Sequence, residues 1–133
     1  MPTSSSHCTP KETANLMEDW PTSWAGDEED ETVGRGLVAL LGSFTTDLHE
    51  QGLSGGTIRR HLDNLWLIGG EIIREINYQP ARRREAPRAL LLDAIRDGQA
   101  PLVRDLTERE QASVDATARK LLRFLALSNP TPP

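Results

Sequence analysis

One stretch near the middle of the chain, GLSGGTIRRHLDNLWLIGGEIIREINY at residues 52–78, strongly limits the folds open to it. Ser54 is a favourable N-cap residue, and Leu53 before it with Ile58 after it fits a hydrophobic staple. The positions that then recur at helical spacing are Ile58, Leu62, Leu65, Gly69, Ile72 and Ile76, with Trp66 and Ile73 beside them. A helix that is apolar over so wide an arc is typically the central helix of its fold.

A pair of glycines, Gly69 and Gly70, interrupts this long helix. Each glycine costs about 1 kcal/mol against alanine in a helix interior, so the pair needs a structural reason. Either another helix crosses closely there, or the helix kinks. The apolar stripe keeps its phase on both sides of the pair, which favours the close crossing.

Three further helices are predicted around the central one. Residues 31–51 repeat apolar side chains at helical spacing and end at Gly52. A shorter helix over Pro87–Asp97 starts on a proline and stops at Gly98. The last helix opens with a Thr107–Glu110 capping box, and its buried face runs from Val114 to Leu125. Because no strand pattern appears, the sequence predicts an all-α fold, a compact bundle of four main helices.

The first part of the chain has a different composition. Residues 1–32 contain eight acids and one lysine, about −7, so the rest carries about +2 of the overall charge of −5. We expect a disordered acidic tail over residues 1–32, the helical domain over 33–128 and a Pro-rich end over 129–133. Trp20 and Trp24 in this tail either bind a partner or fold back on the body. The acids at 27–31 are expected to be solvated chain, or a competitor of nucleic acid for a basic surface.

Several classes of protein are disfavoured by what the sequence lacks. No apolar run reaches the roughly 18–20 residues that a membrane span needs. The start lacks the order of a secretory signal, and the single Cys8 suits a reducing compartment, so we expect a cytoplasmic protein. There is no Gly-rich phosphate loop, no His/Cys metal set and no serine placed with a base. We therefore expect no enzyme activity, no cofactor, no metal and no small-molecule substrate.

Two arginines at the start of the central helix form the main candidate site. Arg59 and Arg60 oppose the helix dipole, at a few tenths of a kcal/mol each, unless they hold an anion such as a phosphate. The alternative is that Arg59 pairs with Asp63 one turn later while Arg60 is solvated. His61 is expected to be a partly exposed surface histidine, and Trp66 to belong to the core.

A second basic segment lies between the central helix and the next one. Arg82, Arg83, Arg84 and Arg88 either form a loop that follows a nucleic-acid backbone or belong to an ordinary solvated loop. The adjacent Glu85 weakens the first interpretation. Both interpretations stay open on the sequence alone.

The run FTTDLHEQGLSGGTIRRHLDNLWLIGGEI resembles the N-terminal core-binding domain of tyrosine recombinases and phage integrases. That family shows a turn reading L-S-x-x-T followed by a helix that opens with T-[IV] and a basic or aromatic position. The matching residues are Leu53, Ser54, Thr57, Ile58, Arg59 and Arg60. The last helix is similar to the family's closing helix through Leu121, Leu122, Phe124 and Leu125. The resemblance covers roughly residues 35–127.

The resemblance implies a SAM-like bundle with orthogonal packing that clamps one side of duplex DNA. It further implies phosphate contacts from Thr57, Arg59, Arg60 and His61, and weaker ones from Arg119, Lys120 and Arg123. The family's catalytic residues have no match, and the sole tyrosine, Tyr78, ends a helix, so no strand cleavage is implied. These features predict a non-catalytic DNA-binding module, an accessory or remnant of a mobile genetic element. The alternative is a helical protein–protein adaptor or homodimer with no nucleic-acid role.

Overall fold

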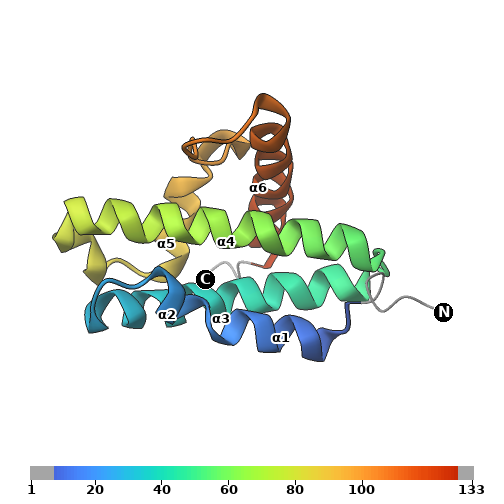
Figure 1. The fold of residues 1–133 in the computed structure, drawn as a ribbon, viewed down its shortest axis with the longest axis horizontal. Coiled ribbons are helices and arrows are strands. Elements are labelled where there is room, and N and C mark those ends of the chain that lie inside the picture. The colour runs from blue at the N-terminus through green and yellow to red at the C-terminus, as the bar shows by residue number, and fades with distance from the viewer. Residues whose placement is uncertain (1–7, 129–133) are drawn as a thin grey trace.

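The computed structural model describes residues 8–128, and every regular element in that range is a helix (Figure 1). The α-helices are α1 (Pro10–Glu18), α2 (Trp20–Trp24), α3 (Glu28–Glu50), α4 (Gly55–Tyr78), α5 (Pro87–Ala94) and α6 (Glu108–Ser128). Two 3₁₀ helices lie in the connections: η2 (Pro80–Arg84) between α4 and α5, and η3 (Arg96–Gly98) between α5 and α6. The all-α prediction is confirmed, and no helix in this range is long and apolar enough to cross a membrane. The predicted Pro-rich end at 129–133 lies outside the described residues.

The structure differs from the expected disordered tail over residues 1–32 wherever it describes that segment. The helix α1 begins with a capping box in which Thr9 and Glu12 exchange side chain–backbone hydrogen bonds. Met17 and Trp20 are buried in the main core. The expectation fails because a good cap and a few well-spaced apolar residues are enough once α3 offers a face to pack against.

The acidic block at the end of this segment forms the first turn of α3 rather than solvated chain. Asp27 is the N-cap, and its carboxylate accepts the backbone N–H of Asp30 at 3.0 Å. Asp30 is fully buried and accepts hydrogen bonds from Gly26 N–H (3.0 Å), Asn77 (3.2 Å) and Arg83 (3.0 Å). Burial raises the pKa of this carboxyl, but the hydrogen bonds outweigh it and leave the pKa below its ordinary value.

The central helix α4 has the predicted start and no kink. The Ser54 hydroxyl accepts the backbone N–H of Thr57 at 3.2 Å, which confirms the N-cap. The helix runs unbroken through Gly69, where an added Cβ would lie 2.3 Å from Cζ2 of Trp24. A close approach therefore explains the glycine, as predicted. The approaching group is the indole of Trp24 from α2, so of the two alternatives for the tail tryptophans the folding back on the body is confirmed. The helix α2 itself was not predicted.

The last two helices agree with the sequence in type and less well in length. The helix α5 ends at Ala94, short of the predicted Asp97, because Asp97 and Gly98 adopt left-handed φ angles of 62° and 73°. The α6 capping box is confirmed: Thr107 N–H donates to Glu110 Oε1 at 2.9 Å, and Glu110 N–H donates to Thr107 Oγ1 at 3.1 Å.

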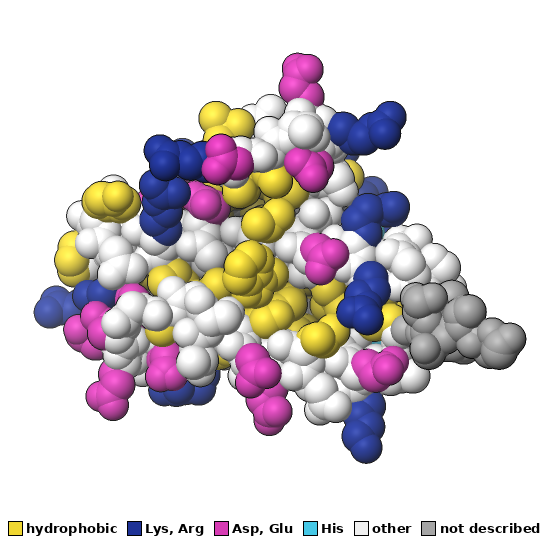
Figure 2. All heavy atoms as spheres, in the orientation of Figure 1, with side chains coloured by type: hydrophobic (Ala, Val, Ile, Leu, Met, Phe, Trp, Pro, Cys, Tyr) yellow, Lys and Arg dark blue, Asp and Glu magenta, His cyan; other side chains and the backbone are white. Residues whose placement is uncertain are grey.

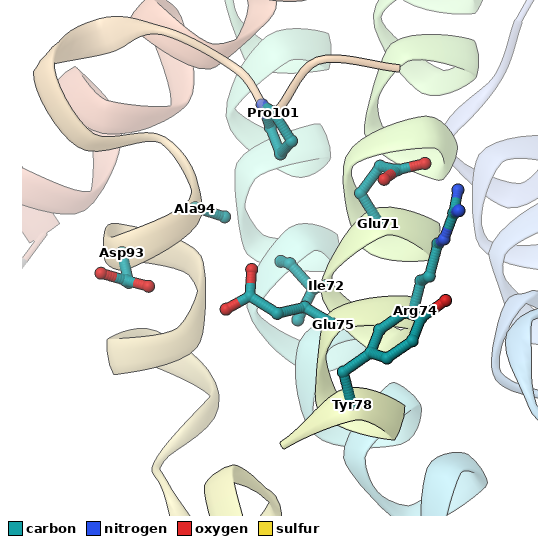
Figure 3. A pocket seen from close by; sticks show the side chains of 8 residues that line it. All are labelled: Glu71, Ile72, Arg74, Glu75, Tyr78, Asp93, Ala94 and Pro101. Carbon is teal, nitrogen blue, oxygen red and sulfur yellow. The ribbon is translucent and has the colours of Figure 1, made fainter. Parts of the chain in front are cut away.

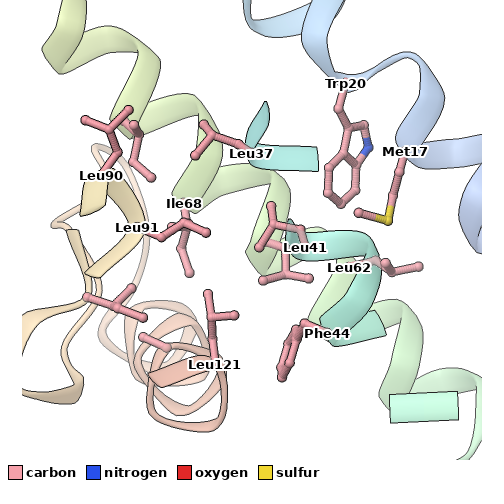
Figure 4. Packing of buried hydrophobic residues seen from close by; sticks show 14 of the residues in the cluster. Met17, Trp20, Leu37, Leu41, Phe44, Leu62, Ile68, Leu90, Leu91 and Leu121 are labelled. Atoms are coloured by element: carbon pink, nitrogen blue, oxygen red, sulfur yellow. The ribbon is translucent and has the colours of Figure 1, made fainter. Parts of the chain in front are cut away.

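One hydrophobic core joins all six α-helices, with α3 passing through it (Figure 4). Leu37, Leu41 and Phe44 of α3 face α1 and α2 on one side and α4, α5 and α6 on the other. Figure 1 shows α6 rising at a steep angle across α3 and α4. This packing puts α6 against the first half of α4, where the candidate site lies.

Candidate nucleic-acid interface

The first turns of α4 carry two arginines that meet solvent. Its first turn contains no acidic residue, and both Arg59 and Arg60 are exposed. Neither arginine forms an ion pair within the described part of the chain, so the expected alternative, Arg59 with Asp63, is not formed there. Thr57 is half-buried and its hydroxyl accepts a hydrogen bond from Ser54 at 2.9 Å. Thr57 therefore serves the cap, while the arginines are open to a ligand.

His61 lies inside the fold and not on the surface as expected. Its side chain is buried against α6, with Nδ1 2.7 Å from Oγ1 of Thr117. Burial, followed by the positive charges of Arg60 and Lys120, lowers the pKa of this imidazole. Because the ring points to α6, we remove His61 from the predicted phosphate contacts. The contact with Thr117 brings Arg60, the neighbour of His61 on α4, toward Lys120, which follows Thr117 by three residues on α6.

A buried polar cluster fixes how α6 sits on α4. The side-chain amide of Asn64 donates to the Ser113 carbonyl (3.1 Å), the Ser113 hydroxyl (3.0 Å) and Oγ1 of Thr117 (2.9 Å). Buried polar groups of this kind must be satisfied, so they favour one rotation of α6 over others. The cluster was not predicted from the sequence, although a histidine and an asparagine three residues apart in an apolar helix are its signal.

The second half of α6 adds three more cations. Lys120 lies 3.4 Å from Oε1 of Gln51 at the end of α3, and it lines a hollow of about 290 Å³ together with Arg123. The stem of Arg119 lies over η3, where a Cβ added to Gly98 would be 2.9 Å from its Cγ. None of these cations has an ion pair among residues 8–128. We call Arg60, Lys120 and Arg123 the α4–α6 cation cluster. Arg59 is not part of it, because it points about 100° away from Arg60 around α4 and lines a groove with Leu16 of α1.

The basic segment at 82–84 is engaged within the protein. Arg82 contacts Glu75 and donates to Glu85 and Asp93 at 3.0 Å each. The hydrogen bond to Glu85 is the main cause that raises the pKa of Arg82 above its ordinary value, and the hydrogen bond to Asp93 raises it further. Burial of the guanidinium lowers this pKa, but by a smaller amount. Its guanidinium is therefore saturated by carboxylates, and we remove Arg82 from the candidate phosphate contacts.

Arg83 is held by the start of α3. Its guanidinium lies 3.0 Å from Asp30, 3.7 Å from Asp27 and 3.8 Å from Glu29. The hydrogen bond to Asp30 raises the pKa of Arg83, and burial opposes it only in part. The acidic block thus neutralises a basic residue of its own chain. Arg88 is half-buried and donates to the Leu125 carbonyl at 2.6 Å. Of the four predicted arginines, Arg84 alone is exposed without an ion pair in the described residues.

An apolar area that the sequence did not predict lies beside the start of α4. Trp66 is 41 % exposed and Leu16 of α1 is 42 % exposed, so the prediction of a core Trp66 is wrong. The Trp66 indole N–H donates to Oγ of Ser23 at 3.0 Å, and Trp24 donates its own to the Trp66 carbonyl at 3.0 Å. The sequence did contain a signal that Trp66 is exposed. Its spacing of seven residues from Arg59 and three from Asp63 puts it on the same side of the helix as these two charged residues.

A hollow of about 360 Å³ between α4 and α5 is also visible (Figure 3). Its lining consists of Glu71, Ile72, Arg74, Glu75, Tyr78, Asp93, Ala94 and Pro101. The carboxylate of Glu75 reaches toward the side of Asp93, while Tyr78 and Arg74 lie on the other side of Glu75. Both acids contact Arg82, so their charge is compensated and we assign the hollow no chemistry. Residues 8–128 contain no group of three His, Cys, Asp or Glu side chains that could hold a metal ion.

Comparison with protein-family models, with curated proteins and with solved structures found no match to this chain. The resemblance to the core-binding domain therefore stays a prediction, as do DNA binding and its alternative. The site is defined by its chemistry: cations without ion pairs in the described residues, exposed at Arg60 and Arg123 and half-buried at Lys120, with a buried polar cluster holding α4 and α6 together.

Proposed function

We propose that this chain is a small non-catalytic DNA-binding module that holds duplex phosphates on the α4–α6 cation cluster. The observation that carries the proposal is the 2.7 Å contact between His61 and Thr117, which brings together Arg60, next to His61 on α4, and Lys120, three residues after Thr117 on α6. Neither cation has an ion pair in the described residues, whereas carboxylates hold Arg82 and Arg83. Other surface arginines such as Arg74 are also unpaired in that range, so it is the position of these two cations on packed helices that favours an external anion between them.

The chemistry suits phosphate and not base recognition. A helix N-terminus with free N–H groups attracts anions, and the start of α4 carries no acid that would repel them. Arginine binds two phosphate oxygens at once, whereas lysine acts as a point charge. Contacts of this kind position a protein on the duplex and carry no sequence information directly. We expect binding to any duplex, with an affinity that falls steeply with salt.

We also propose that α3 to α6 form a SAM-like bundle with orthogonal packing, like the core-binding domain of tyrosine recombinases. The steep crossing of α6 over α4 in Figure 1 supports this proposal. The Ser54–Thr57 turn and the packing of Phe124 on Phe44, with ring centroids 5.5 Å apart, agree with it. In this arrangement α1 and α2 are additions to the bundle, and they cover the side of α3 and α4 that faces away from α6.

The test measures binding of a labelled random duplex by fluorescence anisotropy across a series of salt concentrations. The site variant combines Arg60→Ala, Lys120→Ala and Arg123→Ala. The control combines Arg74→Ala, Arg104→Ala and Arg109→Ala, which removes the same charge from exposed, unpaired positions elsewhere. Arg74 lies about 21 Å along α4 from Arg60 at 1.5 Å per residue.

We expect the site variant to bind at least about tenfold more weakly, with a salt slope smaller by roughly 2 to 3, and the control to change little. Equal losses in both variants would mean that only net charge matters, and the site would be wrong. If the unaltered protein fails to bind duplex at low salt, the proposed function itself fails.

The second candidate function is a helical protein–protein adaptor with no nucleic-acid role. The observation that favours it is the exposed apolar area of Trp66 and Leu16, which lies apart from the cation cluster. Exposed aromatic side chains held in place are typical of protein interfaces.

A further inference from the structure

One line of exposed residues runs along the outer side of α4. Gly56, Arg59, Asp63 and Trp66 are all exposed, and their spacings of three, four and three put them on one face of the helix. We call these four residues the outer stripe. The positions between them, such as Ile58, Leu62 and Leu65, are buried in the core. The stripe is therefore an exposed face of α4, with residues of α1 and α2 lying along its border.

The apolar end of the stripe is held rigidly. Trp66 is fixed by its hydrogen bond to Ser23 and leaves part of its ring in solvent. A groove of about 430 Å³ runs beside it, lined by Leu16, Trp20, Arg59, Leu62, Asp63, Trp66 and Leu67. Figure 2 shows hydrophobic side chains gathered across the middle of this face, over α4, with acidic and basic side chains around them. An ordered, half-exposed indole loses little entropy on binding and suits an interface.

The other end of the stripe offers space. No heavy atom lies within 4 Å of a Cβ added to Gly56, so the first turn of α4 presents bare backbone to solvent. Bare backbone lets a large ring approach closely, which a side chain would prevent. The stripe thus has a protruding ring at one end, a flat surface at the other and opposite charges between them.

This order of residues is complementary to itself when reversed. Around a two-fold axis level with residue 61, Arg59 faces Asp63 of the partner subunit, and Asp63 faces Arg59 of the partner subunit. Trp66 then lies over Gly56 of the partner subunit, and the same contact repeats on the other side. Such a contact, using one patch on both copies, is the commonest form of homodimer. Both charges are available for it, because neither has an ion pair in the described residues.

We infer that a second copy of this chain docks on the outer stripe, with the two α4 helices antiparallel. The stripe spans only about three helical turns, so the interface falls in the small, transient class. We expect a dissociation constant on the order of 10–100 μM. Dimer formation is independent of nucleic-acid binding, since Arg60, Lys120 and Arg123 are not in the stripe.

The test uses charge reversal at exposed positions, measured on the full chain by sedimentation equilibrium. Arg59→Asp puts two acids on each stripe, and Asp63→Arg puts two arginines there. Each single variant turns attraction into repulsion at two symmetric contacts, and we expect dissociation constants about 10- to 30-fold higher. The double variant Arg59→Asp with Asp63→Arg restores both pairs and should dimerise as the parent does. A mixture of the two single variants should form a heterodimer, because their stripes are complementary.

The outcomes separate the antiparallel contact from a general effect of charge on self-association. Unchanged helical circular dichroism in each variant shows that the fold is intact. A parent that stays monomeric at 1 mM, or single variants that dimerise like the parent, would overturn the inference. Single variants that are monomeric but are not rescued by mixing or by the double change would overturn the proposed pairing. Duplex binding measured on the same variants keeps this result apart from the proposed function.

Discussion

Replacing Gly69 by alanine is the sharpest test of how α2 packs on α4. A Cβ at this position would lie 2.3, 2.4 and 2.9 Å from Cζ2, Cη2 and Cε2 of Trp24. These distances are far below van der Waals contact, so the indole must move. Its hydrogen bond to the Trp66 carbonyl, at 3.0 Å, would then be lost or distorted.

The expected size of the effect follows from three contributions. Alanine gains about 1 kcal/mol over glycine in a helix interior. Overpacking costs about 1–3 kcal/mol, and loss of the Trp24 hydrogen bond costs about 1 kcal/mol more. We expect Gly69→Ala to lower the free energy of unfolding by about 1–3 kcal/mol. For a chain of this size, Tm should fall by roughly 3–6 °C for each kcal/mol lost.

The neighbouring Gly70 provides a matched control. A Cβ added there would lie 3.5 Å from Cδ1 of Trp24, an ordinary contact, so Gly70→Ala should stabilise the protein by about 0.5–1 kcal/mol. Urea unfolding followed by circular dichroism measures both variants. In a Trp24→Ala background, Gly69→Ala should also become stabilising. If Gly69→Ala is as stable as the parent while Trp24 is intact, the close packing of this indole is refuted.

Two further predictions concern pH and buried charge. Asp30→Asn should lower the free energy of unfolding at pH 7 by about 2–3 kcal/mol, with exposed Glu29→Gln changing it by under about 0.5 kcal/mol. Because the pKa of Asp30 is lowered in the folded protein, its contribution to the free energy of unfolding is present above about pH 4 and is lost as the pH falls through that lowered pKa. Urea titrations from about pH 7 to about pH 2.5 should show this loss in the parent and not in Asp30→Asn. The pKa of His61 is lowered from 6.5, so stability should fall as pH drops from 6.5 toward the lowered value. NMR titration of the His61 ring checks the pKa, and His61→Gln should remove that part of the pH dependence.

Local signals in the sequence predicted much of the fold. The helix starts at Ser54 and Thr107 were predictable because a cap is made by residues within three positions of each other. The apolar spacing of α3 and α4 gave their extent within a few residues. Gly69 also indicated a close approach, although the identity of the approaching group depends on a contact between α2 and α4 that spacing does not reveal.

The segment before α3 was misjudged because its stability comes from long-range packing. Its composition is polar, acidic and poor in large apolar residues, which is typical of disorder. Trp20 and Trp24 nevertheless pack against each other, with ring centroids 5.7 Å apart, and Trp24 donates a hydrogen bond to the backbone of α4. The sequence did contain two signals of helix starts, the Thr-x-x-Glu pattern at Thr9 and the N-cap residue Asp27. The disordered-like composition of the segment led to the wrong prediction in spite of them.

The candidate site was predicted only in part for the same reason. Exposure of Arg59 and Arg60 follows from the position of the buried stripe, which the sequence contains. Partners from distant segments decide the rest: Asp30 and Asp93 occupy Arg83 and Arg82, and no local pattern joins these positions.

Three consecutive residues of α4 explain why the two proposed surfaces can be tested separately. Successive helical residues point about 100° apart, so Arg59, Arg60 and His61 face three directions. His61 turns inward to Thr117 of α6, three residues before Lys120. Arg60 is exposed, and Arg59 lines the groove with Leu16 of α1. A change at Arg59 should therefore weaken self-association with little effect on phosphate binding, and a change at Arg60 should do the reverse. A single surface serving both roles would instead make the two variants lose both properties together.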